Sequence, residues 1–395
     1  MVKFRDALVS RRHADDDILG EKQKDELSAL IAEANEALKT ADGTARFIAG
    51  APERYGRIVP PLPHSALREW LDIIAVAMAV AFGIRGLFFQ PFKIPTSSMQ
   101  PTLYGIHFME RENSSNPLLG KLPAPVDGLL FSARPAKVVV DKDGMVNPDS
   151  LKRTGNFLFD STSFDIAGRT YRLPGEPAKV LEYSGLSPYV LYKAGTKLCD
   201  GFLSQGDHLF VDRVGFHLTG LHRGDVTVFN TEGLVSGDGR KLMDLSGYYY
   251  IKRLAGLPGD TLKIVDRTLY VRPKGEKEFR KITEFSAKFD RLYSGKGGYQ
   301  GHANSPGEGN ISFYLRTPEE EYTVPDDHYF MLGDNTKFSA DSRIFGPVPR
   351  RNIVGRAFVV FWPFSRRWGL ADHAAALDIP TGESVRGTFP SMYYQ

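Results

Sequence analysis

One stretch of this 395-residue chain is far more apolar than the rest and follows a long polar segment. Residues 70–89 read WLDIIAVAMAVAFGIRGLFF, and twenty helical residues measure about 30 Å, the thickness of a hydrocarbon core. Two charges, Asp72 and Arg85, lie near its ends, and the uncharged run Ile73–Ile84 is short enough to suit a buried helix as well. Because aromatic residues stand at both ends, we predict a transmembrane anchor over residues 66–90.

A cleavable secretory signal is the competing interpretation, because two Ala-x-Ala triplets occur within residues 75–79. A signal peptide begins with a short basic region, whereas here a long segment of mixed charge comes first, so we expect a retained anchor. The nearby cations are Arg54, Arg57 and Arg68 on its N-terminal side and Lys93 on the other. The positive-inside rule then places residues 1–65 in the cytoplasm and the rest of the chain outside it.

Composition excludes several classes of protein. The net charge of +3 offers no electrostatic case for a nucleic-acid partner. The single cysteine, Cys199, excludes an intramolecular disulfide and a cysteine-based zinc site. We therefore expect no nucleic acid, no metal and no cofactor.

The remainder of the chain divides into a helical tail and a mainly β part. Apolar residues at helical spacing within Asp15–Thr40 predict one or two amphipathic helices. After residue 95, short runs of β-branched and aromatic residues are separated by Gly, Pro and Asp, which predicts strands. The predicted strands are Lys137–Val140, His208–Val211, Val226–Asn230, Tyr248–Arg253, Thr261–Val265, Thr268–Arg272 and Ala357–Trp362. The glycine-rich stretch Ser294–Asn310 is typical of a flexible surface loop.

Two segments together supply a candidate nucleophile and a candidate base. Pro95 and Pro101 bracket a Thr-Ser-Ser run, and such a rigid turn can present one hydroxyl, although serine-rich turns are usually plain loops. None of the nine histidines lies in a familiar hydrolase motif, which leaves a buried, neutral lysine as the base. Lys252 lies within the apolar segment 248–260. An outward lysine on an amphipathic strand stays open as the alternative.

A third segment, residues 331–346, is dense in turn formers and side chains that form hydrogen bonds. It can form a local polar network that contains an Asp–Arg pair. The spacing of its acidic residues does not match an EF-hand calcium loop. A purely structural turn remains an alternative to a site.

Together these segments, in this order behind the predicted anchor, resemble the type I signal peptidases (leader peptidases), which are Ser/Lys proteases of the bacterial cytoplasmic membrane. IPTSSMQPTL resembles the family's nucleophile segment, YIKRLAGLPGD its lysine segment, and GDN with SADSR its third sequence box. These motifs and two further strand-like pieces occupy residues 94–103, 250–260, 333–335, 339–343, 205–212 and 223–229.

The resemblance implies that Ser98 is the nucleophile and Lys252 the general base. Ser97 stands where Gly is common in the family and is the alternative nucleophile, but the position before Met-x-Pro favours Ser98. The resemblance further implies an oxyanion site formed by the Ser98 amide and the Thr96 hydroxyl, and a lysine oriented by Ser339. The implied supporting residues are Arg253, Asp334, Asn335, Asp341 and Arg343.

The substrate is expected to bind by strand addition, extended between residues 92–95 and the strand that contains Lys252. Shallow apolar pockets would accept small residues at the first and third positions before the cut. The residues expected to line them are Phe92, Ile94, Pro95, Met99, Tyr250 and Ile251. The resemblance also places the apolar surface near Phe88 and Phe89 on the bilayer.

The resemblance thus implies a serine endopeptidase, bound to the bacterial inner membrane by one span, with its catalytic domain on the periplasmic side. It would remove signal peptides from secreted precursors. Its expected partners are those signal peptides and the lipid bilayer, with the secretion machinery as a further candidate. Two alternatives stay open, namely a specialised Ser/Lys peptidase with a narrow substrate set and a catalytically dead, anchored binding relative.

The expected fold is mainly β, a signal-peptidase-like catalytic domain with a second β-rich lobe, behind a transmembrane helix and a helical cytoplasmic tail. The largest departure from the family is the separation of Ser98 and Lys252 by 154 residues, which implies an insertion. The expected parts are the tail 1–65, the anchor 66–90, the catalytic core 91–105, 203–260 and 325–365, the insertion 106–202, the second lobe with its flexible loop 261–324, and the C-terminal tail 366–395.

Overall fold

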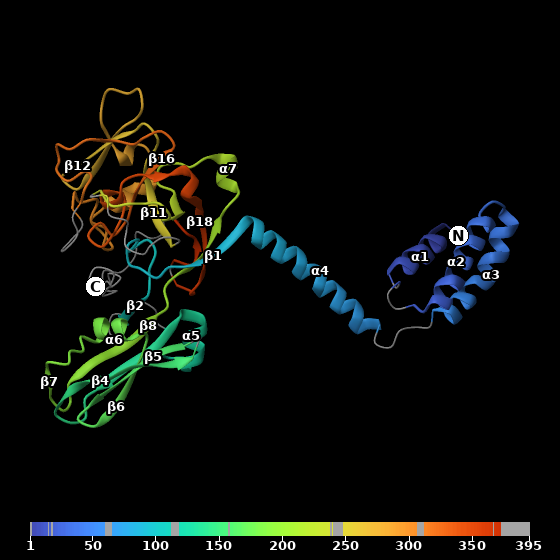
Figure 1. Cartoon of the computed structure of the whole chain (residues 1–395), viewed down its shortest axis with the longest axis horizontal. Helices are drawn as coiled ribbons and strands as arrows, with labels where there is room; N and C mark the ends of the chain where they lie inside the picture. Colours follow the sequence, from blue (N-terminus) through green and yellow to red (C-terminus); the bar gives the residue numbers. More distant parts are fainter. Residues whose placement is uncertain are drawn as a thin grey trace. The chain divides into compact units, whose positions relative to one another are not determined.

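The computed structural model describes most of the chain, and Figure 1 labels its helices and strands. The described residues are 2–14, 16, 19–59, 65–111, 118–156, 159–237, 239, 248–305, 312–365 and 367–372. The chain divides into two compact units, residues 1–83 and 84–395. The predicted C-terminal tail lies outside the described residues from 373 onward, as does the side chain of Arg85.

The first unit is helical. Its first three helices are α1 (Val2–Ala14), α2 (Glu21–Ala37) and α3 (Ala41–Ile58). Leu8, Leu27 and Leu30 are buried between them, and Leu27 and Leu30 belong to the apolar face predicted within Asp15–Thr40. Thr40 caps α3, because its side chain accepts a hydrogen bond from the amide of Gly43.

Helix α4 (Ser65–Phe88) contains the apolar stretch. The large apolar side chains of α4 that the structure describes lie exposed, with Trp70 at 65%, Ile73 at 59% and Phe82 at 60%. In the part of the chain that the structure describes, no helix has both the length and the apolar character needed to cross a membrane. The predicted span over 66–90 is therefore corrected: an exposed apolar helix lies there, and its uncharged run Ile73–Ile84 is bounded by Asp72 and Arg85.

The second unit is built on an eight-stranded antiparallel sheet in the order β1-β9-β18-β10-β11-β16-β17, with β19 paired to β18. Its strands are β1 (Phe89–Lys93), β9 (His208–Asp212), β10 (Val226–Asn230), β11 (Tyr249–Gly256), β16 (His328–Leu332), β17 (Val348–Pro349), β18 (Ile353–Trp362) and β19 (Gly369–Leu370). Apolar side chains of β9, β10 and the segment after β1 form one core, which includes Met99, Leu209 and Val228.

Two strands of this sheet keep a free edge among the described residues. β1 pairs with β9 alone, through register pairs that run from Phe89 to Lys93. β11 pairs with β10 from Tyr249 onward, but its pairing with β16 begins only at Arg253. The first half of β11 is therefore open on one side, as β1 is.

A smaller sheet, β14-β13-β12-β15, forms a lobe of its own. Its elements are β12 (Thr261–Val265), β13 (Thr268–Arg272), β14 (Arg280–Lys281) and β15 (Tyr322–Thr323), with the 3-10 helices η2 (Ile282–Glu284) and η3 (Ala287–Tyr293). Leu262, Ile264 and Phe289 are among its fully buried side chains. Short helices α7 (Gly215–Thr219), α8 (Ser342–Phe345) and η4 (Arg350–Asn352) complete the connections of the main sheet.

Between the nucleophile segment and β9 the chain forms a further lobe, drawn in green and teal in Figure 1. Its two sheets have the orders β2-β8-β3 and β6-β5-β4-β7. The elements are β2 (His107–Glu110), α5 (Ala124–Phe131), β3 (Ala133–Val139), β4 (Gly144–Asn156), β5 (Phe159–Ile166), β6 (Arg169–Pro174), α6 (Pro177–Ser184), β7 (Leu191–Tyr192) and β8 (Lys197–Ser204). Phe164, Ile166 and Val180 belong to its own buried core.

The mainly β prediction is confirmed. Three of the predicted strands, Val226–Asn230, Thr261–Val265 and Thr268–Arg272, have the bounds that the structure gives. The loop predicted over Ser294–Asn310 is irregular over its described residues 294–305, but its predicted surface position is wrong at Tyr299 and His302, which are buried. The prediction rested on the glycine-rich composition of this loop, but the side chains of Tyr299 and His302 pack into the interior. Residues 306–310 lie outside the described residues.

Candidate active site

Ser98 and Lys252 are in direct contact. The Lys252 ammonium nitrogen, Nζ, lies 2.7 Å from Ser98 Oγ and 3.0 Å from the carbonyl oxygen of Ile251. Ser98 lies in the turn after β1, and Lys252 lies in β11. Both are buried, with exposures of 6% and 3%. The alternative of an outward lysine on the strand is therefore wrong.

Burial changes the protonation of this lysine. An ammonium ion loses hydration when it is buried, so burial lowers the pKa of Lys252 to about 8. Asp341 and Asp334 act in the opposite direction, and Arg343 adds to the lowering. The ring of Tyr250 lies beside the ammonium, with its centroid 5.1 Å from Nζ. A large neutral fraction of Lys252 is thus available near pH 8, as a general base requires.

The turn that contains Ser98 is held by the third segment. The Asn335 amide donates to the Ser98 carbonyl oxygen at 3.0 Å, and Asn335 Nδ2 donates to the Ser97 carbonyl oxygen at 3.1 Å. Gly333 lies directly behind this turn, where a Cβ atom would be 2.6 Å from the Ser98 oxygen. Only glycine allows so close an approach of the two backbones.

Arg253 follows the lysine and is fully buried. Its guanidinium holds both carboxylate oxygens of Asp334, at 2.7 and 2.6 Å, and donates to the Gly224 carbonyl oxygen at 2.7 Å. Asp334 also accepts a hydrogen bond from Thr102 in the nucleophile segment. Burial would raise the pKa of Asp334, but Arg253 holds it below the usual range. Arg253 and Asp334 therefore link the lysine strand to the nucleophile segment.

Asp341 and Arg343 form a second buried pair. Arg343 donates from Nε and Nη2 to the two oxygens of Asp341, at 2.9 and 2.8 Å, and the Gly333 amide donates to the same carboxylate at 3.0 Å. Burial opposes ionisation of Asp341, but the charge of Arg343 keeps its pKa low. Arg343 also donates to the Thr336 carbonyl oxygen at 2.9 Å, so this pair fixes the loop around Ser339.

Ser339 does not have the contact expected of it. Its hydroxyl is buried beside Asp341, whose pKa it helps to lower. Among the described residues it makes no hydrogen bond to Lys252, whose ammonium contacts Ser98 and Ile251 instead. The backbone of Gly333 lies against the Ser339 hydroxyl, at a distance too short for a Cβ atom. Orientation of the lysine by Ser339 is thus not supported by this geometry.

The expected substrate residues divide into two groups. Phe92, Tyr250 and Ile251 are half-buried, and Pro95 is exposed, so their surfaces are accessible. Ile94 and Met99, in contrast, are buried in the core with exposures of 2% and 0%. Direct contact of these two side chains with a peptide is therefore corrected to a packing role beneath the turn.

The remaining expected residue, Thr96, is half-buried. Its backbone packs against Gly105, where a Cβ atom would lie 2.3 Å from the Thr96 carbonyl oxygen. In the described segments no group of three or more His, Cys, Asp or Glu side chains is placed to hold a metal ion.

Comparison with known proteins decides the family. The model of the family described as "Signal peptidase, peptidase S26" matches residues 67–120 and 196–362, more than half of the chain. The chain belongs to the signal peptidase family. The family match excludes residues 121–195, most of the green and teal lobe that separates Ser98 from Lys252.

Individual relatives of the family agree with this assignment. A probable signal peptidase I-2 of Synechocystis sp. is 31% identical over 175 residues, which are 44% of this chain and 62% of that protein. The signal peptidase I of Leptolyngbya laminosa is 30% identical over 42% of this chain and 64% of its own. The chain thus spans less than two thirds of the length of these two relatives. Signal peptidase IB of Staphylococcus aureus is 31% identical over 42% of this chain and 74% of its own.

A solved structure is also similar. The crystal structure of a signal peptidase I from Enterococcus faecalis V583 has 28% sequence identity, covers 34% of this chain and 95% of its own, and gives a TM-score of 0.22. The family assignment rests on the sequence match and not on this superposition.

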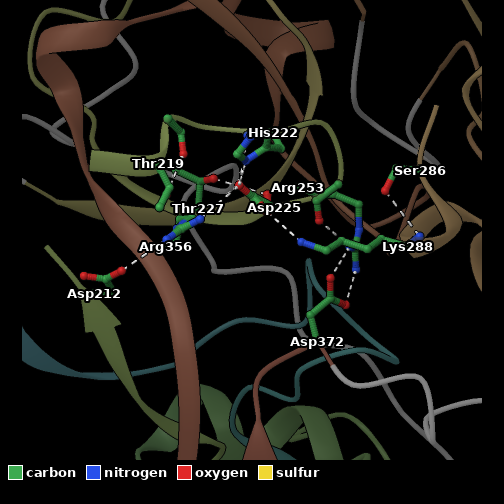
Figure 2. A network of polar contacts seen from close by, with 12 residues as sticks. Asp212, Thr219, His222, Asp225, Thr227, Arg253, Ser286, Lys288, Arg356 and Asp372 are labelled. Carbon is green, nitrogen blue, oxygen red and sulfur yellow. Dashed lines mark hydrogen bonds and ion pairs between the residues drawn. The ribbon is translucent and has the colours of Figure 1, made fainter. Parts of the chain in front are cut away.

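Three contacts at the signal peptidase site involve residues that sequence reasoning missed. Thr102 lies inside the nucleophile segment and donates to Asp334, which the resemblance names as a supporting residue. Tyr299 donates its hydroxyl hydrogen to Thr102 Oγ1 at 2.9 Å, from a segment that reads as a loop. Asp372 contacts Arg253 from the C-terminal segment, as Figure 2 shows. No local pattern marks Tyr299 or Asp372.

Proposed function

We propose that this chain is a serine endopeptidase that removes signal peptides from secreted precursor proteins, with Ser98 as nucleophile and Lys252 as general base. The observation that carries the proposal is the 2.7 Å contact between Lys252 Nζ and Ser98 Oγ in a buried setting. A lysine whose pKa is lowered to about 8 can accept the serine proton at moderate pH. The family match supports the same reading.

The reaction takes place in two stages. Ser98 Oγ attacks the carbonyl carbon of the scissile bond while Lys252 takes its proton. The resulting oxyanion is held by the Ser98 amide and the Thr96 hydroxyl, and the C–N bond breaks as Lys252 gives its proton to the leaving amine. Lys252 then takes a proton from water, which attacks the acyl carbon. The ester bond to Ser98 Oγ breaks as Lys252 returns that proton to Ser98, and the signal peptide leaves with a free carboxylate.

The free edges of β1 and of the first half of β11 support binding of an extended peptide by strand addition. The two strands are close at one end, where the rings of Phe92 and Tyr249 meet with centroids 5.2 Å apart. The accessible side chains of Phe92 and Ile251 would then face the substrate.

The test is cleavage of a precursor with an Ala-x-Ala site in detergent. We expect wild type to cut after the second Ala, and Ser98→Ala and Lys252→Ala to be inactive with unchanged melting temperature. Ser97→Ala is the matched control, because it removes the neighbouring hydroxyl, and it should remain active. Activity of Ser98→Ala together with loss of activity in Ser97→Ala would contradict the assignment of the nucleophile.

We further propose that the protein is bound to the bacterial cytoplasmic membrane through α4, with its catalytic domain on the periplasmic side. The exposed apolar side chains of α4 support this, since such a surface is stable when lipid covers it. Flotation with lipid vesicles tests it. We expect Ile73→Asp with Phe82→Asp to reduce co-flotation, whereas Leu218→Asp, at an apolar position of α7 that is 84% exposed, should not.

A narrower substrate set is a second candidate function. The lobe between β2 and β8 has its own buried core, and most of it lies outside the family match. The presence of a separately packed lobe in the same unit as the site supports a specialised role. Cleavage of one native precursor, but not of a general Ala-x-Ala substrate, would favour the specialist. A catalytically dead relative is disfavoured because Ser98 and Lys252 are both present and in contact.

A further inference from the structure

Asp372 lies beyond residue 362, where the family match ends, yet it contacts the interior of the site. Its carboxylate accepts hydrogen bonds from Arg253, with Oδ2 2.8 Å from Nη1 and Oδ1 3.2 Å from Nη2 (Figure 2). It also forms an ion pair with Arg291 of η3. One carboxylate from the C-terminal segment therefore bridges two arginines.

These charges are removed from water. The side chains of Arg253, Arg291 and Asp372 are 0%, 6% and 13% exposed. Burial lowers the pKa of Arg291, and the positive charge of Arg253 lowers it further. Asp334 alone cannot balance two buried guanidinium groups, so Asp372 supplies the second negative charge.

The backbone before Asp372 fixes where its carboxylate lies. Strand β19 pairs with β18 through Leu370 and Gly369, and the Ala371 amide donates to the Phe358 carbonyl oxygen at 2.9 Å. Ala371 is buried in the same core as Met99 of the nucleophile segment. The C-terminal segment is thus packed against the site and presents Asp372 at a defined position.

We propose that Asp372 is a positioning residue for the Ser98/Lys252 pair. It holds the Arg253 guanidinium from one side, while Asp334 holds it from the other. Arg253 is adjacent to Lys252 in β11, and Asp334 is adjacent to Asn335, whose amide fixes the Ser98 carbonyl. Loss of Asp372 therefore displaces both halves of the pair. This inference rests on the proposed function, because it assigns a role in the same reaction.

The experiment compares Asp372→Asn and Asp372→Glu in the full-length protein, with the precursor cleavage assay. A displaced nucleophile and base reduce the chemical step, so we expect kcat of Asp372→Asn to fall roughly 10- to 100-fold with KM within about twofold. Asp372→Glu keeps the charge and should recover most of kcat. The matched control is Asp260→Asn, which breaks another buried pair, with Arg223 at 2.6 Å, and whose carboxylate contacts Arg223 and the Leu257 amide but not Arg253. It should lower the melting temperature without lowering kcat.

If Asp372→Asn does not fold, the charge-balanced double variant Arg291→Met with Asp372→Asn replaces it and must show the same loss of kcat. An unchanged kcat in the folded variant would overturn the proposal. So would an Asp372→Glu variant no more active than Asp372→Asn, since the effect would then be one of packing alone.

A second readout separates this proposal from the proposed function. A small fluorophosphonate reacts with Ser98 without any signal peptide: Ser98 Oγ bonds to phosphorus, fluoride leaves, and Lys252 takes the serine proton, so the rate reports the reactivity of the pair. If wild type is phosphonylated but does not cut the precursor, the proposed function fails, while slower phosphonylation of Asp372→Asn still supports positioning. If wild type and Asp372→Asn are phosphonylated at equal rates, or neither is phosphonylated, positioning is overturned.

Discussion

Gly333 and Ser98 approach each other so closely that a Cβ atom on residue 333 would lie 2.6 Å from the Ser98 carbonyl oxygen and 2.1 Å from Ser339 Oγ. This contact sets the distance between the third segment and the nucleophile turn. The Asn335 amide donates to the same Ser98 carbonyl oxygen, so the Gly333 and Ser98 backbones cannot move apart without breaking that hydrogen bond.

Gly333→Ala should therefore displace the Ser98 turn. We expect a loss of about 1–3 kcal/mol in the free energy of unfolding from overpacking. Displacement of the nucleophile should reduce kcat about 100-fold. Chemical denaturation and precursor cleavage measure the two effects. Gly128→Ala is the control, because only one atom lies within 4 Å of its Cβ, and wild-type activity of Gly333→Ala would contradict the argument.

The pKa of Lys252 predicts how the rate depends on pH. Only the neutral amine accepts the serine proton, and the pKa of about 8 means that the neutral fraction rises as the pH rises to 8. We expect kcat/KM to increase about tenfold per pH unit below pH 8 and to level off above it. Cleavage rates between pH 6 and 10 measure this, and a profile that falls with increasing pH would exclude Lys252 as the base.

Asp341→Asn should destabilise the protein strongly. Arg343 would keep its charge in a fully buried position and lose its carboxylate partner, which costs about 3–5 kcal/mol. Because the folded-state pKa of Asp341 is lowered, its stabilisation is complete above the ordinary carboxylate pKa and is lost as the pH falls. Urea unfolding at pH 7 measures the loss. The exposed pair of Lys274 and Asp326 provides the control, since Asp326→Asn should change nothing measurable.

Tyr299→Phe should have a small effect. The Tyr299 hydroxyl donates to Thr102 Oγ1 in a buried position, and the loss of one such bond costs about 1 kcal/mol. Because Thr102 still donates to Asp334, we expect activity to fall less than about fivefold. Thermal unfolding checks the prediction against Tyr189→Phe, an exposed tyrosine. A loss of activity as large as that of Lys252→Ala would contradict the assignment of a merely supporting hydrogen bond to Tyr299.

The sequence predicted the strands well where alternation and turn residues agree, as in β10, β12 and β13. The sequence could not show that Lys252 is buried. From Lys252 to Gly256 every residue of β11 is buried, so alternation of polar and apolar residues does not distinguish a buried face from an exposed one. The resemblance supplied the Ser98–Lys252 pair, which local spacing could not, since the two lie 154 residues apart.

The missed residues share a physical cause. Tyr299 and Asp372 reach the site from irregular segments, where neither a helical nor a strand period is present. Their roles depend on which buried charges and hydroxyls face them, which only the tertiary fold determines. The same limit explains Ile94 and Met99, because an apolar residue beside a nucleophile can line a pocket or fill the core beneath it.

The lobe between β2 and β8 leaves and rejoins the chain at one place. His107 is directly paired with Ser204, and Glu110 with Gly201, so the two ends lie side by side in an antiparallel ladder. Partners in such a ladder have Cα atoms about 5 Å apart, a gap that a tight turn closes. A shorter ancestor could thus have acquired the lobe at a single hairpin tip, without moving Ser98 or Lys252. The same arrangement makes this hairpin a natural site for exchanging the lobe when peptidases of altered selectivity are engineered.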